Sequence, residues 1–142
     1  MMKKHYQRYH YRRRNVTKLP VYKKALYIFK LSRQIVEYLR GDKSVLDLHR
    51  SKYMADQFSD KLVMASLGLA PKIAMAEATP DPNVKLESLS SIKRTTNALL
   101  HYCEKLEANH GHGKEFLSTL RKEVTKFGHL QNKWALSISN KN

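Results

Sequence analysis

The chain has 142 residues, of which 42% are hydrophobic, enough for one domain with its own core. It carries 27 Lys or Arg against 12 Asp or Glu, a net charge of +15, so a polyanion is the first partner to consider. A single cysteine excludes an internal disulfide, and no apolar run approaches about 18 residues. We therefore expect a cytoplasmic protein that does not enter a membrane.

The first 18 residues form a basic arm, which we separate from a helical domain at residues 19–139. Residues 1–36 hold eleven cations and no acid, and Glu37 is the first acid of the chain. In the arm, tyrosines alternate with cations, a pattern in which rings stack on unpaired bases and cations hold phosphates. We predict nucleic-acid contacts for Lys3, Lys4, Arg8, Arg12, Arg13, Arg14 and Lys18, and base stacking for Tyr6, Tyr9 and Tyr11.

Two other interpretations of the arm stay open. One is a disordered tail whose charge is incidental. The other is an organellar transit peptide, since the arm is rich in arginine and lacks acids. The arm has no hydrophobic face and few small residues, which makes the transit peptide the least favoured alternative.

The spacing of apolar residues predicts two long helices in the first half of the domain. One begins near Pro20, a good first-turn residue, and ends at Gly41-Asp42, after which Ser44 and Asp47 are candidate caps. The other runs from about His49 to Ala78, and we expect Gly68 and Pro71 to bend it. Its predicted apolar stripe is Met54, Phe58, Leu62, Ala65, Leu69, Ile73 and Ala76, and that of the first helix is Tyr22, Ala25, Leu26, Phe29, Ile35, Val36 and Leu39.

Two further helices follow the break at residues 79–83. They run from about Val84 to Glu107 and from about Lys114 to Ile138, each with apolar positions that alternate steps of three and four. This regularity predicts an all-α fold, an antiparallel up-down-up-down four-helix bundle. Some apolar residues fall beside the stripes and belong either to a wider core or to a subunit interface: Leu31, Leu67, Met75, Leu100, Leu130 and Leu136.

The chemistry-bearing residues do not form a catalytic pattern. His110 and His112 lack further ligands at a recognised metal spacing, and Cys103 lies on an apolar stripe, where a buried, inert thiol is expected. We therefore expect no enzymatic activity, no cofactor and no metal. On the helices, the candidates for phosphate contact are Lys23, Lys24, Lys93, Arg94, Arg121, Lys122 and Lys126, against the simpler interpretation of a solvated face with ion pairs.

Several segments resemble a known family. "LPVYKKALYIFKLSRQIVEYL" (19–39) and "MADQFSDKLVMASLGLAPKIAMAEAT" (54–79) resemble the first two helices of the small bacterial four-helix-bundle proteins first noticed in intervening sequences of 23S ribosomal RNA genes. "KEVTKFGHLQNKWALS" (122–137) resembles the accessory variability determinants of diversity-generating retroelements, a subgroup with the same bundle. The wider family often ends its second helix with Asn-Ile-Ala-Glu-Gly, of which only Ala76 and Glu77 match here.

The resemblance covers residues 19–138 and implies a function. Accessory variability determinants form homopentamers, bind the retroelement reverse transcriptase and the template-repeat RNA, and support mutagenic cDNA synthesis without being catalytic. The expected partners are therefore a reverse transcriptase, template RNA and cDNA, and further copies of this chain. The alternatives are a general or ribosome-associated RNA-binding bundle, and a bundle that serves only protein assembly.

Overall fold

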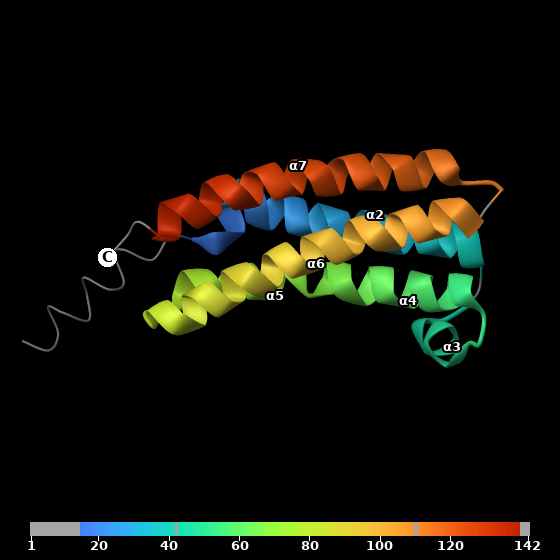
Figure 1. Cartoon of the computed structure of the whole chain (residues 1–142), viewed down its shortest axis with the longest axis horizontal. Coiled ribbons are helices and arrows are strands. Elements are labelled where there is room, and N and C mark those ends of the chain that lie inside the picture. The colour runs from blue at the N-terminus through green and yellow to red at the C-terminus, as the bar shows by residue number, and fades with distance from the viewer. Residues whose placement is uncertain (1–14, 42, 110, 140–142) are drawn as a thin grey trace, which may run out of the picture.

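The described residues of the computed structural model, 15–41, 43–109 and 111–139, form an all-helical bundle without a strand (Figure 1). A short 3-10 turn, η1 (Val16–Lys18), precedes α2 (Pro20–Arg40). The other elements are α3 (Val45–Arg50), α4 (Met54–Leu67), α5 (Leu69–Ala78), α6 (Pro82–Asn109) and α7 (Lys114–Ser139). The ends of α6 and α7 extend the predicted helices by one or two residues.

The bundle has four rods, because α4 and α5 follow each other along one line. The rod α2 packs against α4, α5 and α7, while α6 packs against α4, α5 and α7 from the other side. In Figure 1, α7 and the α4–α5 rod lie on opposite edges of the bundle. The core between the rods includes Ile28, Leu62, Ile92, Leu99, Leu120 and Phe127, all fully buried.

The start of α2 and the caps of α3 agree with the sequence. Pro20 occupies the first turn of α2, where its missing N–H has no partner to lose. Ser44 and Asp47 form a capping box: the Asp47 amide donates to Ser44 Oγ (3.1 Å), and the Ser44 amide donates to Asp47 Oδ2 (3.0 Å).

The prediction of one helix from His49 to Ala78 is wrong at its beginning. Residues 45–50 form the separate α3, and α4 starts at Met54. The cause is Ser51, whose hydroxyl accepts the Tyr53 amide (3.1 Å) and donates to Asp56 Oδ2 (2.7 Å). Such a hydroxyl competes with the helical pattern and ends α3 there. Further on, the helix is interrupted at Gly68, because α4 ends at Leu67 and α5 begins at Leu69, whereas Pro71 lies inside α5; the expected bend stays a prediction.

Two residues of the predicted apolar stripes lie outside the core. Leu26 of α2 and Met54 of α4 are exposed. In α2 the core side is instead centred on Val21, Ala25, Ile28 and Ser32, with the polar Ser32 fully buried. Helical spacing alone fixes a stripe only to within one residue on either side, which is why these assignments failed.

A buried carboxylate joins α2 to α4. Asp56 has no exposed surface and forms ion pairs with Arg40 and with Lys43 (2.7 Å). Burial raises the pKa of Asp56, but hydrogen bonds from Lys43, Ser51 and Arg40 outweigh it and lower the pKa below the usual 3.8. The carboxylate is therefore ionised at neutral pH and holds the end of α2 against the start of α4.

We predict that Asp56→Asn destabilises the protein by roughly 3 kcal/mol at pH 7, because Arg40 loses its counter-charge in a site with little water. Since the folded pKa is depressed, this contribution is present above about pH 4 and is lost as the pH falls through the folded pKa. Urea unfolding of both proteins at pH 7 and pH 3 measures it, with the exposed Glu104→Gln as control. If the difference in free energy of unfolding between the unchanged protein and Asp56→Asn is the same at pH 7 and pH 3, the stabilising role of the ionised Asp56 is contradicted.

The turn before α7 depends on a glycine. Gly113 has φ +80°, and a Cβ there would lie 2.6 Å from Leu39 Cδ2, whereas Gly111 has open space around it. We predict that Gly113→Ala destabilises the protein by about 1–2 kcal/mol, because a side chain is strained at positive φ and clashes with α2. Denaturant unfolding should show almost no change for the control Gly111→Ala. Equal effects of the two substitutions would show that the close approach of Leu39 is unimportant.

Candidate nucleic-acid interface

A row of lysines lies along the seam between α2 and α7. It is organised by Glu123 of α7, whose carboxylate binds Lys24 of α2 (3.1 Å) and Lys126 one turn further along α7 (3.1 Å). These hydrogen bonds hold the pKa of Glu123 below its usual 4.5, against the opposing effect of burial. One carboxylate therefore fixes two lysines from two helices and stays ionised while doing so.

This ion pair and the exposed residues beside it define a surface that we call the α2–α7 face. On α2 the face consists of Lys23, Lys24, Tyr27 and Lys30, and on α7 it consists of Lys122, Glu123, Lys126 and Lys133. The spacing within each set places its members along one side of the helix. Tyr27 belongs to it because Lys24 Nζ lies 5.4 Å from its ring centre. Such a surface offers cations for phosphates and one ring for a base.

The charges of this face are unbalanced. Lys23, Lys30, Lys122 and Lys133 are exposed, and none has an ion pair within the described part of the chain. The only acid among the residues of the face is Glu123, already bound by two lysines. The next acids on these helices, Glu37 and Glu115, lie toward the other end of the seam, beyond Lys30 and Lys122. The positive potential is thus concentrated near the start of α2.

The structure gathers some predicted contact residues and separates others. Lys23, Lys24, Lys122 and Lys126 lie on the α2–α7 face, and the exposed Lys18 immediately precedes α2. Lys93 and Arg94 lie on α6, away from it. The guanidinium of Arg94 binds Glu87 (3.0 Å) two turns earlier, which favours the simpler interpretation of a solvated face with ion pairs for Arg94. Outside the described residues lie Lys3, Lys4, Tyr6, Arg8, Tyr9, Tyr11, Arg12, Arg13 and Arg14.

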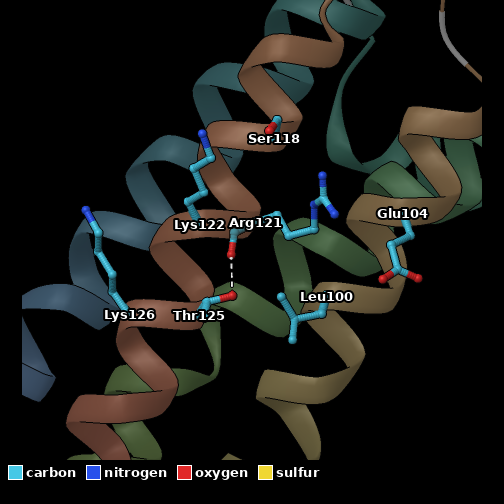
Figure 2. A pocket seen from close by; sticks show the side chains of 7 residues that line it. All are labelled: Leu100, Glu104, Ser118, Arg121, Lys122, Thr125 and Lys126. Carbon is cyan, nitrogen blue, oxygen red and sulfur yellow. Dashed lines mark hydrogen bonds between the residues drawn. The ribbon is translucent and has the colours of Figure 1, made fainter.

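Arg121 faces a different part of the surface from its neighbour Lys122. It extends toward α6, where its Nε lies 3.1 Å from Glu107 Oε1. Figure 2 shows Arg121 over an open groove between α6 and α7, with Lys122 and Lys126 on the side of α7 away from α6. The groove has a volume of about 570 Å³ and is lined by Leu100, Glu104, Ser118, Arg121, Lys122, Thr125 and Lys126. Its Glu104 carboxylate opposes an anion, so the groove is less suited to phosphate than the α2–α7 face.

Tyr27, Lys30 and Lys133 were not among the predicted contact residues. A signal for them exists in the sequence, since Tyr27 and Lys30 stand four and seven residues after Lys23, and Lys133 stands seven after Lys126. What the sequence does not contain is the pairing of α2 with α7, which places these two rows beside each other.

The remaining chemistry-bearing residues behave as structural groups. Cys103 is fully buried, and burial, together with the charge of Glu107, raises the pKa of its thiol to about 12. The expectation of a buried thiol is therefore confirmed. Among the described residues, no three His, Cys, Asp or Glu side chains gather as metal ligands would, and no helix is both long and apolar enough to span a membrane.

Comparisons with models of protein families, with curated proteins and with solved structures find no match to this chain.

We predict that Glu123→Gln tightens binding of single-stranded RNA by about threefold at physiological salt, because it leaves Lys24 and Lys126 without their counter-charge. Glu87→Gln is the matched control, since it changes the net charge equally and releases Arg94 of α6 instead. Fluorescence anisotropy with a labelled RNA measures both. If the two variants tighten binding to the same degree, only net charge matters and the α2–α7 face has no special role.

Proposed function

We propose that this protein is a non-catalytic accessory subunit of a diversity-generating retroelement, which binds template RNA and the reverse transcriptase during mutagenic cDNA synthesis. Two independent arguments support this. The first is the resemblance of residues 19–138 to the accessory variability determinants. The second is the α2–α7 face, where four exposed lysines have no counter-ion within the described residues and the one acid is already bound.

The observation that best supports RNA binding is that Glu123, the one acid of the α2–α7 face, is bound by Lys24 and Lys126. A solvated helix face normally mixes acids with its lysines. Here Glu123 joins α2 to α7, and its side chain is only 12% exposed, so it offsets little of the outward potential. The lysines would displace the condensed counter-ions of a polyanion that lies along the seam, and the release of these ions into solution supplies salt-sensitive affinity.

The arm would extend the same surface. Six of its seven cations precede η1 in the sequence, and η1 leads into the start of α2, the end of the seam where the lysines gather. RNA held by the lysines of the bundle would then have tyrosines of the arm available for stacking on unpaired bases. The division of labour is backbone contact by the bundle and base contact by the arm.

The proposed architecture is an up-down-up-down bundle assembled into a homopentamer. The contacts of helix ends support the topology: Arg40 at the end of α2 binds Asp56 near the start of α4, and Glu107 near the end of α6 binds Arg121 in the first half of α7. A ring of five copies would multiply the positive surface fivefold and let one RNA contact several subunits. In this arrangement the protein positions template and polymerase, and the polymerase performs the chemistry.

The experiment compares two quadruple variants with the same net charge. Lys23, Lys30, Lys122 and Lys133 are changed to Glu on the α2–α7 face, and the exposed Lys52, Lys93, Lys105 and Lys114 are changed to Glu elsewhere. We expect the first to lower the slope of log K against log salt by about 3 for single-stranded RNA, at roughly 0.7 per phosphate contact. Deletion of residues 1–14 should also weaken binding and flatten the slope.

The outcomes separate the parts of the proposal. Equal losses in both quadruple variants would sink RNA binding by the α2–α7 face. Copurification with ribosomes and not with a reverse transcriptase would instead favour the general RNA-binding alternative. The pentamer predicts a solution mass five times the 16.6 kDa of the chain, measured by light scattering.

A further inference from the structure

The outward side of the α4–α5 rod is almost without charge. Between Lys61 and Asp81 the only ionisable side chains are Lys72 and Glu77. Both contact neighbouring rods: Lys72 Nζ donates to Thr95 Oγ1 of α6 (3.0 Å), and Trp134 Nε1 of α7 donates to Glu77 Oε2 (3.1 Å). In a protein of net charge +15, a helical stretch of this length with only two ionisable residues, both partly buried and in contact with other helices, is unexpected.

Large apolar side chains occupy that side of the rod. Met64, Leu67 and Met75 are 50%, 45% and 58% exposed, and with the exposed Pro71 they follow steps of three, four and four. We call these four residues the α4–α5 ridge. It spans about 16 Å, or three helical turns. A continuous apolar row of this kind marks an interaction surface, whereas single exposed apolar residues need no explanation.

The ridge is distinct from a wide core stripe. Of the apolar residues that fell beside the predicted stripes, Leu31, Leu100 and Leu130 pack against the core. Leu67 and Met75 remain exposed on the ridge. Methionine is also suited to such a surface, because its flexible thioether adapts to the shape of a partner.

A cation stands on each side of the ridge. Lys61 Nζ lies 5.6 Å from the ring centre of Phe58, which contacts His101 and Tyr102 of α6, so Lys61 is on the α6 side. Arg33 Cζ lies 5.8 Å from the ring centre of Phe29 on α2. Arg33 is on the α4 side of α2, because Arg40, two turns later on the same side, binds Asp56 of α4. Asp60, the nearest acid of α4, is mostly buried and bound by His49 (3.0 Å).

We propose that the α4–α5 ridge is the docking site for an amphipathic helix of a partner protein, with apolar residues at three- and four-residue spacing and acids on both flanks. The apolar residues of that helix would pack on Met64, Leu67 and Met75, in the helix-in-groove manner. Its acids would meet Lys61 and Arg33, and this charge pairing would select an acid-flanked helix over a base-flanked one.

Other occupants fit the charges less well. A second copy of this chain brings 27 cations against 12 acids, and several of those acids, such as Asp56, Glu107 and Glu123, are held in its own ion pairs. The arm at residues 1–18 contains no acid at all. RNA would find cations only at the two flanks, and the apolar ridge between them offers its phosphates no hydrogen-bond donor. The proposal does not depend on RNA binding, because α4 and α5, which carry the ridge, lie on the edge of the bundle opposite to α7 (Figure 1).

The test uses the full chain and two labelled helical peptides of about 18 residues, each with leucines at i, i+3, i+4 and i+7. One peptide has Glu on its flanks and the other has Lys. We expect the Glu peptide to bind, and Met64→Lys with Met75→Lys to weaken it about tenfold or more, since burial of the two side chains is lost. The matched control Leu136→Lys, an exposed apolar residue of α7, should leave binding unchanged.

The design distinguishes docking from simple charge attraction. The Lys substitutions on the ridge add positive charge, so purely electrostatic binding of the Glu peptide would become tighter and overturn the proposal. Arg33→Glu with Lys61→Glu should reverse the preference between the two peptides. No binding of the Glu peptide to the full chain, or its displacement by RNA, would also overturn it.

The mass of the protein in solution tests whether a second copy of this chain, and not a partner protein, covers the α4–α5 ridge. Light scattering of the Met64→Lys, Met75→Lys variant should give the mass of the unchanged protein, and a reduced mass would show that the ridge joins copies of this chain and overturn the proposal. Circular dichroism verifies folding of each variant. If the Lys variant does not fold, Met64→Gln with Met75→Gln provides the same comparison without added charge.

Discussion

The scarcity of acids in a strongly basic chain is the constraint on which the rest of the structure depends. With 12 acids for 27 cations, most cations have no acid to pair with. Several of the acids also join helices: Asp56 binds Arg40 across α2 and α4, Glu107 binds Arg121 across α6 and α7, and Glu123 binds Lys24 across α2 and α7. Among the described residues, Lys23, Lys30, Lys122 and Lys133 lie at the surface without an ion pair, and they mark where a polyanion would find positive charge.

Because the acids are distributed in this way, two edges of the bundle differ in surface charge. Along the seam of α2 and α7, the one central acid is held between helices, and the lysines around it face solvent. Along α4 and α5, the two ionisable residues that follow Lys61 contact other helices, and methionines and a leucine face solvent. The same physical rule, that charges are paired where they are partly buried, produces a basic surface on one side and a nearly uncharged one on the other.

Much of the fold follows from apolar spacing, and the failures have local causes. The steps of three and four gave α6 and α7 within one or two residues, because long helices with one apolar stripe leave little freedom. They did not separate α3 from α4, since that break comes from hydrogen bonds of Ser51 that no periodicity reports. Leu26 and Met54 were misplaced because the edge of a stripe is ambiguous by one residue.

The sequence predicts which basic residues could contact a nucleic acid, but it does not predict which of them lie together on one surface. Lys23, Lys24, Lys122 and Lys126 could be named from the sequence, yet Lys30 and Lys133 join them only because α2 lies beside α7. The ion pair of Arg94 with Glu87 spans two helical turns and depends on side-chain conformation, which the sequence does not report. Tertiary pairing and side-chain geometry are long-range information, which composition and periodicity do not contain.

The most direct test of the central claim is lysine acylation of the full-length protein with and without single-stranded RNA. The modified lysines are then identified by mass spectrometry after digestion. The account predicts that RNA protects Lys23, Lys30, Lys122 and Lys133, while Lys52, Lys93, Lys105 and Lys114 react as before. Uniform protection of both sets, or protection of the second set alone, would contradict the assignment of the α2–α7 face as the nucleic-acid interface.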